Sequence, residues 1–176
     1  MTTCENCGLH IKTQTSGDEL GLCDPCKGLA RDVPEVRVSP ISRSDLELIL
    51  AWRSHPDIYR HFRNQTEPLT WSDHLSWFNS RDPSQQDFII HYDGRRVGVV
   101  GLNTNDEITI YIGDFSARNK GIATSVINWL KERFNARTPL TAEVNERNDS
   151  SKQLFLSCGF REEARSDGWI TFVYNC

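Results

Sequence analysis

The run Arg118-Asn119-Lys120-Gly121-Ile122-Ala123-Thr124 decides the fold, because it separates a strand pattern from a long helical pattern. Before it, isoleucines alternate at positions 108, 110 and 112, as on one face of a β-strand. After it, apolar residues recur every four positions from 122 to 134, as on one face of an α-helix.

A glycine-bearing turn at the start of a helix is suited to an anionic ligand, because free backbone N–H groups and the positive end of the helix dipole meet there. Gly121 has no Cβ, so a phosphate can approach its backbone, and Arg118 and Lys120 add positive charge. The run therefore predicts a phosphate cradle. A simple helix cap with surface cations is the alternative.

The rest of the chain from residue 36 onward alternates strand and helix signals, which predicts an α/β fold. Strands are expected at 36–38, 86–92, 95–102, 108–112, 140–144, 160–165 and 169–174, and helices at 42–54, 71–78, 122–134 and 148–158. Asp-Gly pairs at 93–94 and 167–168 predict two tight hairpin turns.

Length and charge narrow the functional classes. A chain of 176 residues fits one core-forming domain with a small appendage, and a net charge of -4 disfavours nucleic acid as the main partner. No apolar run is long enough to cross a membrane, and the N-terminus lacks the apolar core of a signal peptide. We therefore expect a cytoplasmic protein without a membrane partner.

Two Cys-x-x-Cys pairs near the N-terminus have the spacing of a four-cysteine zinc site. They are Cys4 with Cys7 and Cys23 with Cys26. A segment this short cannot bury a core, so a metal would supply its folding energy, and an all-cysteine shell favours a structural Zn²⁺. Chance pairs or a redox dithiol are the alternatives. We expect a zinc-ribbon-like module over 1–32, a polar linker over 31–35, and the main domain over 36–176.

Two motifs of the main domain resemble the GNAT acetyltransferase superfamily. One is the R-x-x-G-x-A turn at 118–123, and the other is Asn148-x-x-Ser151-x-x-Leu154-Phe155, which follows 25 residues later. The resemblance implies the GNAT fold, in which helices flank a mixed, twisted central sheet, and it implies acetyl-CoA as cosubstrate. Ala123 replaces the second glycine of the turn motif, a change that the family tolerates.

The resemblance also implies cofactor contacts. The strand segment before the turn would touch the acetyl-pantetheine and present a backbone N–H to the thioester carbonyl, the turn would hold the pyrophosphate, and the second motif would flank the pantetheine. The residues concerned are Tyr111, Ile112, Gly113, Arg118, Asn119, Lys120, Gly121, Ile122, Ala123, Thr124, Asn148 and Ser151.

Acetyl transfer to an amine also requires that protons move. Glu143 is the predicted base, since ribosomal-protein alanine acetyltransferases of this superfamily carry a glutamate at the same offset before the asparagine; pairing with a surface cation is the alternative. Phe155 stands where many relatives have a tyrosine, and a phenyl ring cannot donate a proton. Tyr111, Ser151 and Ser157 are the remaining candidates for the acid, or the thiolate leaves unprotonated.

The acceptor side is less defined. On the helix expected over 42–54, Arg53 shares the inward face, where a guanidinium snorkels to solvent, forms an ion pair or faces a polar cleft. Residues 52–56 and the pattern Trp71-x-x-His74-x-x-Trp77-Phe78 resemble acetyltransferases of amino-sugar nucleotides and some aminoglycoside acetyltransferases. Arg53, Trp71 and His74 are the predicted substrate residues, with core packing as the alternative for the last two.

Two further groups of polar residues stay open. The histidines at 55, 61, 74 and 91 are each candidates for a base. Arg60, His61 and Arg63 form a basic cluster that fits either a nucleotide diphosphate or a solvated face.

Together these expectations favour an acetyl-CoA-dependent N-acetyltransferase that acts by direct transfer on a primary amine of a small molecule, such as an amino sugar or amino-sugar nucleotide. A protein or peptide N-acetyltransferase is one alternative. A non-catalytic acetyl-CoA sensor, whose zinc ribbon contacts a protein partner, is another. The oligomeric state is open, with a homodimer as one option.

Overall fold

The computed structural model describes residues 2–4, 7–8, 10–11, 23–32 and 36–175, so part of the expected linker lies outside the described residues. The main domain contains two antiparallel sheets. The larger has the order β3 (Val36–Pro40), β4 (Gln86–Tyr92), β5 (Arg95–Leu102), β6 (Ile108–Ile112). The smaller has the order β7 (Leu140–Asn145), β9 (Trp169–Tyr174), β8 (Arg161–Ser166).

Both hairpins turn where the Asp-Gly pairs predict. Asp93 and Gly94 have φ values of 50° and 70°, and Asp167 and Gly168 have 53° and 80°. Two consecutive residues with positive φ are the signature of the tight turn that matches the twist of antiparallel strands.

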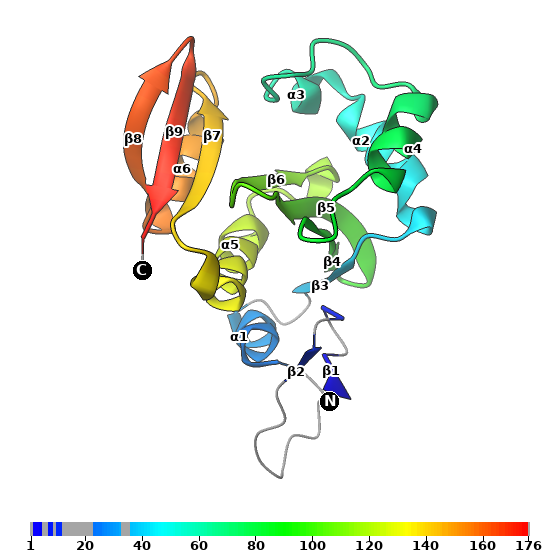
Figure 1. The fold of residues 1–176 in the computed structure, drawn as a ribbon, viewed down its shortest axis with the longest axis vertical. Coiled ribbons are helices and arrows are strands. Elements are labelled where there is room, and N and C mark those ends of the chain that lie inside the picture. The colour runs from blue at the N-terminus through cyan, green and yellow to red at the C-terminus, as the bar shows by residue number, and fades with distance from the viewer. Residues whose placement is uncertain (1, 5–6, 9, 12–22, 33–35, 176) are drawn as a thin grey trace.

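The two sheets meet at one point. Glu107, just before β6, forms a parallel bridge with Thr141 of β7, and the N–H of Thr141 donates to the carbonyl of Asp106 at 2.9 Å. Among the described residues the two strands make no other bridge, and Figure 1 shows them separating beyond this contact. The separation leaves the free edges of β6 and β7 facing each other across a gap.

Helices cover the sheets as the sequence predicts, with one addition. α2 (Leu46–Arg53) follows a turn in which the carboxylate of Asp45 accepts the N–H of Ser42 at 2.8 Å, and α4 (Trp71–Asn79) is capped by Thr70. The short α3 (Pro56–Tyr59) between them was not predicted. α5 (Ile122–Arg133) and α6 (Asp149–Ser157) follow β6 and β7 in the chain, and Ile122, Trp129 and Phe155 belong to the main core.

The N-terminal module combines a small hairpin with a helix. β1 (Thr2–Thr3) pairs with β2 (His10–Ile11), and α1 (Asp24–Asp32), which was not predicted, lies against α5 (Figure 1). Its buried Leu29 belongs to the same core as Trp129 of α5, and the indole N–H of Trp129 donates to the Sγ of Cys26 at 3.2 Å. The module and the main domain therefore share one core.

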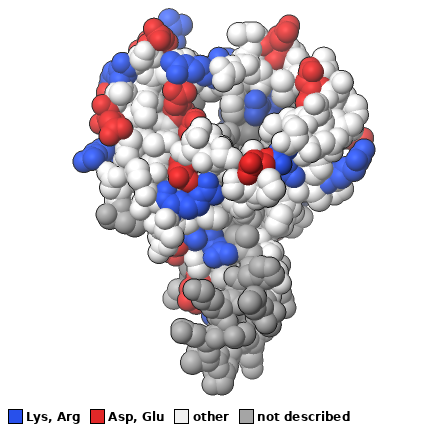
Figure 2. Space-filling view, in the orientation of Figure 1, with Lys and Arg blue, Asp and Glu red and all other residues white. Residues whose placement is uncertain are grey.

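The face of the molecule that Figure 2 shows carries charges of both signs. In Figure 2, Lys and Arg alternate with Asp and Glu over the visible face, which is hollowed between the β7–β9 side and the α2–α4 side. Within the described part of the chain, no helix has the length and apolarity needed to traverse a bilayer.

Candidate active site

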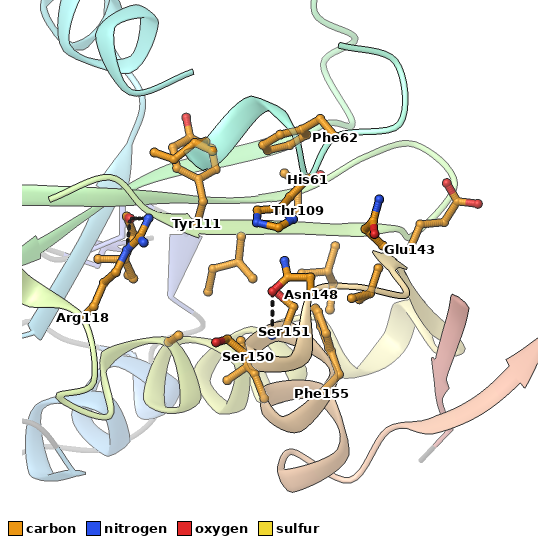
Figure 3. Close-up of a pocket in the computed structure, with 18 of the residues that line it drawn as sticks. His61, Phe62, Thr109, Tyr111, Arg118, Glu143, Asn148, Ser150, Ser151 and Phe155 are labelled. Atoms are coloured by element: carbon orange, nitrogen blue, oxygen red, sulfur yellow. Dashed lines mark hydrogen bonds between the residues drawn. The ribbon is translucent and has the colours of Figure 1, made fainter. Parts of the chain in front are cut away.

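The separated strands open into a large cavity of about 1030 Å³. Its walls come from β6, the start of α5, the end of β7, the start of α6 and the segment between α3 and α4. Figure 3 places Arg118 at one end of this cavity and Glu143 at the other, with His61 and Asn148 between them. The cavity therefore joins the predicted phosphate turn to the predicted base.

The start of α5 builds the first end. Gly121 is the N-cap with a φ of 75°, which is left-handed backbone that glycine adopts without steric cost. No side chain caps this helix, so the N–H groups of its first turn are left for a ligand, and they carry the positive end of the helix dipole. All seven residues predicted for the turn line the cavity, namely Arg118, Asn119, Lys120, Gly121, Ile122, Ala123 and Thr124.

Arg118 is braced rather than free. Its Nε and Nη2 both donate to the carbonyl of Ile112 at 3.2 Å, and its guanidinium lies 3.9 Å from the centre of the Phe115 ring. These contacts tie the turn to the end of β6 and hold a positive charge at the cavity wall. Burial lowers the pKa of Arg118, but a guanidinium stays charged at physiological pH.

The exposed edge of β6 supplies backbone donors. The backbone N–H of Gly113 donates to the carbonyl of Val97 at 2.8 Å, and the backbone N–H of Asn103 donates to the carbonyl of Glu107 at 3.0 Å. In an antiparallel pair, every second residue of a strand bonds to the neighbouring strand and the residues between point the other way. In this register the N–H groups of Ile110 and Ile112 therefore point away from β5, toward the gap. Both residues line the cavity, and Ile110 was not among the predicted cofactor residues.

Gly113 has a different place from the one predicted. Its N–H is already bonded to Val97, and it does not line the cavity. A Cβ added to it would lie 2.2 Å from the Trp52 ring, so the glycine permits close packing of Trp52 of α2 against the end of β6. The predicted backbone donor to a thioester is thus better met by Ile110 and Ile112.

The second motif faces this edge from α6. The Oδ1 of Asn148 accepts the N–H of Ser151 at 3.2 Å, which caps α6, and leaves the side-chain amide hydrogens of Asn148 for a ligand. Figure 3 shows Asn148 and Ser151 across the cavity from Thr109 and Tyr111. A narrow chain between them would meet polar groups on both sides.

Two carboxylates stand at the other end. Glu143 lines the cavity and forms an ion pair with Arg63, whose Nη1 lies 2.8 Å from its Oε1. Glu107, which the sequence did not single out, also lines the cavity and accepts a bond from the Nδ2 of Asn103 at 3.3 Å. Burial, and after it the charge on Glu143, raise the pKa of Glu107 above its usual range. A carboxylate with a raised pKa accepts a proton more readily near neutral pH.

Phe155 stands where many relatives have a tyrosine, and the candidate acids near it differ in whether they have a proton to donate. Phe155 lines the cavity but is buried, with its ring centre 5.1 Å from that of Phe160. The hydroxyl of Ser157 is bonded to the carbonyl of Leu154 at 2.8 Å. Burial raises the pKa of Tyr111, so its phenol stays neutral and keeps a proton to donate.

Of the four candidate histidines, His61 alone lines the cavity. The ring of His55 accepts the N–H of Asp57 at 3.1 Å, and that of His91 is bonded to Ser39 at 2.9 Å. His74 is buried in α4 and stacked on Trp77. Burial lowers the pKa of His61, whose Nδ1 is buried without a hydrogen-bond partner among the described residues.

The predicted substrate residues separate into two groups. Arg53, at the end of α2, lines the cavity, as do Arg60, His61 and Arg63 of the basic cluster. Trp71 is 43% exposed on α4, and neither it nor His74 lines the cavity. The amphipathic pattern of α4 does not distinguish a cleft wall from the outer layer of the domain, and their substrate role remains a prediction without support from this cavity.

The four cysteines fit a metal site. Their sulfur atoms all lie within 4.8 Å of one another, and all four side chains are buried. Cys23 immediately precedes α1 and Cys26 lies in its first turn, while the carbonyl of Cys4 accepts the N–H of Gly8 at 2.9 Å in a tight turn. Four convergent thiols are a donor set that Zn²⁺ prefers.

The fold brings an uncapped helix start, a free strand edge and two carboxylates to the wall of one cavity. Residues 35–161 match the family described as "Acetyltransferase (GNAT) domain", so the chain belongs to the GNAT acetyltransferase family. This confirms the predicted fold class and the predicted family.

Individual proteins also resemble this chain in sequence and in fold. The chain is 38% identical over 159 residues to the uncharacterized protein MJ1062 of Methanocaldococcus jannaschii, covering 82% of this chain but only 32% of that relative. A crystal structure of a domain from M. jannaschii aligns with a TM-score of 0.72 and 35% identity over 80% of this chain and 98% of that one.

A spermidine N-acetyltransferase from Vibrio cholerae, solved with CoA and spermine, aligns with a TM-score of 0.65 and 19% identity over 80% of this chain and 94% of that one. At this identity the likeness concerns the fold.

Proposed function

We propose that this protein transfers the acetyl group of acetyl-CoA directly to a primary amine of a small molecule. One observation carries the proposal. A single cavity contains an uncapped helix start that suits a pyrophosphate, the exposed edge of β6 that suits a pantetheine arm, and two carboxylates beyond them. The family of the chain and the CoA bound in the V. cholerae structure support the same cosubstrate.

Each group of cavity residues binds the part of acetyl-CoA that lies next to it. The first-turn N–H groups of α5, with Lys120 and Arg118, bind the diphosphate. The N–H groups of Ile110 and Ile112 face the gap, where they bind the pantetheine and stabilise the negative charge that develops on the thioester oxygen. Asn148 donates to the pantetheine from the opposite side.

Proton removal falls to the carboxylate end. We keep Glu143 as the proposed base, and its ion pair with Arg63 must loosen when the acceptor enters. Glu107 stands beside it with a raised pKa and forms no ion pair with any residue that the structure describes, so it is the second candidate. Because both carboxylates face the same cavity end, an ammonium group placed there is attracted before it is deprotonated.

An amino sugar or amino-sugar nucleotide is the proposed acceptor. The support is the mixed lining of the cavity, where carboxylates suit the amine and the side chains of Arg60, Arg63 and His61 suit phosphate oxygens. A protein or peptide N-acetyltransferase and a non-catalytic sensor remain the alternatives, the latter because Phe155 removes the usual acid.

The test is release of free CoA from acetyl-CoA in the presence of a panel of amines. We expect release with an amino sugar or its nucleotide, and none from acetyl-CoA alone. Tight CoA binding without release from any amine would reject transfer and leave the sensor. Release with peptide amines alone would favour the peptide acetyltransferase.

We also propose that the four cysteines hold one structural Zn²⁺ per chain. The closeness of their buried sulfurs supports this, and the bond from Trp129 shows how the module is fixed to α5. Elemental analysis of the purified protein is expected to find about one zinc per chain. Because the module shares the core of the main domain, we expect it to contribute to the stability of that domain.

A protein partner that binds the zinc module, a homodimer and a cytoplasmic location are further proposals.

A further inference from the structure

Arg53 is a cation in the cavity wall that no carboxylate of the described residues neutralises. Its Nε and Nη2 both donate to the Oε1 of Gln65, at 3.0 and 2.7 Å, and its guanidinium lies 3.8 Å from the centre of the Phe62 ring. Gln65 is itself buried, and its Nε2 donates to the carbonyls of Arg53 and Glu67 at 2.7 and 3.1 Å. The guanidinium is therefore held in place by neutral groups alone.

The neighbouring arginines differ from Arg53. Arg60 forms an ion pair with Asp57 at 3.0 Å, and Arg63 forms one with Glu143 at 2.8 Å. Within the described part of the chain, Arg53 lies within ion-pair distance of no carboxylate, and its Nη1 has no hydrogen-bond partner.

The titratable groups that face Arg53 are neutral. Burial raises the pKa of Tyr111, so the phenol keeps its proton, and burial lowers the pKa of His74, so the imidazole carries no charge near neutral pH. Burial also lowers the pKa of Arg53, which measures the cost of holding this charge away from water, yet a guanidinium stays protonated. A partly buried cation with a free donor and no counter-ion is arranged for an anion that arrives from outside.

We infer that the acceptor carries an anionic group, a phosphate or a carboxylate, which Arg53 binds while the amine reaches Glu107 and Glu143. The inference rests on the proposed function and names the class of acceptor. Charge complementarity supports it, because the same cavity offers an unpaired cation at Arg53 and two carboxylates elsewhere in its wall. A polycation such as spermine, which the V. cholerae structure contains, would meet repulsion at Arg53.

The test uses three acceptors that each carry an amine at C2, namely glucosamine 1-phosphate, glucosaminic acid and glucosamine, of which the last has no anionic group. Spermidine is the polycation. Wild-type protein is compared with Arg53→Gln, Arg53→Lys and the control Arg165→Gln, which removes an exposed arginine of β8 outside the cavity. Thermal unfolding and CoA affinity are measured first, and Arg53→Lys serves if Arg53→Gln does not fold.

We expect the wild type to prefer an anionic acceptor, and the ratio of the phosphate to the carboxylate identifies which anion the site takes. Arg53→Gln is expected to lower kcat/KM for that acceptor about 10- to 100-fold while leaving glucosamine within about 3-fold. Arg53→Lys falls between, and Arg165→Gln matches the wild type. Preference for glucosamine or spermidine, or an equal loss for all acceptors in Arg53→Gln, would overturn the inference.

Calorimetry with the CoA-loaded protein separates this inference from the proposed function. If no acceptor is acetylated, but glucosamine 1-phosphate or glucosaminic acid binds the wild type and binds Arg53→Gln at least 10-fold more weakly, the anion site stands and the transfer fails. If neither anion binds the wild type, or if the wild type and Arg53→Gln bind the anion equally, the inferred anion site is rejected together with the proposed transfer.

Discussion

Gly121→Ala, compared with Gly94→Ala, tests the phosphate turn against a matched control. The two glycines have φ values of 75° and 70°, and a Cβ added at either would meet no atom within 4 Å. They differ in place, since Gly121 lines the cavity and Gly94 forms the turn between β4 and β5. Any difference between the two variants therefore reports on a ligand rather than on backbone strain.

The magnitudes follow from this geometry. Left-handed backbone costs an L-residue about 1–2 kcal/mol, so both variants lose about that much free energy of unfolding. In Gly121→Ala the new methyl group also occupies the approach to the backbone N–H groups. Losing one charge-assisted hydrogen bond to the pyrophosphate, worth about 1.5–3 kcal/mol, weakens CoA binding about 10- to 100-fold.

Calorimetric titration with CoA and urea unfolding of the three proteins measure both quantities. We expect similar losses of stability in the two variants and weaker CoA binding in Gly121→Ala alone. Equal CoA affinity in all three proteins would show that the turn does not approach the phosphates, and the reasoning about the uncapped start of α5 would fail.

Four further predictions concern the two carboxylates, the missing acid and the metal. Glu143→Gln is expected to lower kcat more than it weakens CoA binding, and an unchanged pH–rate profile would remove it from the mechanism. A base must be ionised to accept a proton, and the pKa of Glu107 is raised, so activity that depends on Glu107 falls on acidification at a higher pH than it would with an ordinary glutamate. Glu107→Gln is expected to remove this acidic limb of the pH–rate profile. If the acidic limb persists in that variant, Glu107 is not the base. Phe155→Tyr restores a phenol and is expected to raise kcat about 2- to 10-fold, and no gain would indicate that the thiolate leaves unassisted. Trp129→Phe removes the donor to Cys26 and is expected to speed zinc loss to a chelator about 10-fold, whereas Trp77→Phe, on α4 away from the cysteines, does not; equal rates would refute that bond's role.

The elements could be predicted because local chemistry decides them. The alternating isoleucines of β6 and the Asp-Gly hairpins each depend on neighbours a few residues away. α3 was missed because four residues are too few for a period, and α1 because cysteine spacing says nothing about the backbone that continues past the last cysteine.

The site could be predicted only in part, because contacts between distant segments complete it. The phosphate turn is contiguous, and its seven residues all line the cavity; their contact with a cofactor stays a prediction. Glu107 reaches the site through its bridge to Thr141, 34 positions along the chain, and no motif marks that pairing. Trp71 and His74 were predicted from a resemblance to other acetyltransferases, and a pattern on one helix does not say which cleft, if any, that helix borders.

A crystal structure of the protein with acetyl-CoA tests the central claim most directly. We predict that the pyrophosphate lies against the first-turn N–H groups of α5 at Gly121–Thr124, and that the pantetheine passes between β6 and β7 with its thioester beside Ile110 and Ile112. Acetyl-CoA bound elsewhere, or no binding at millimolar concentration, would contradict the account.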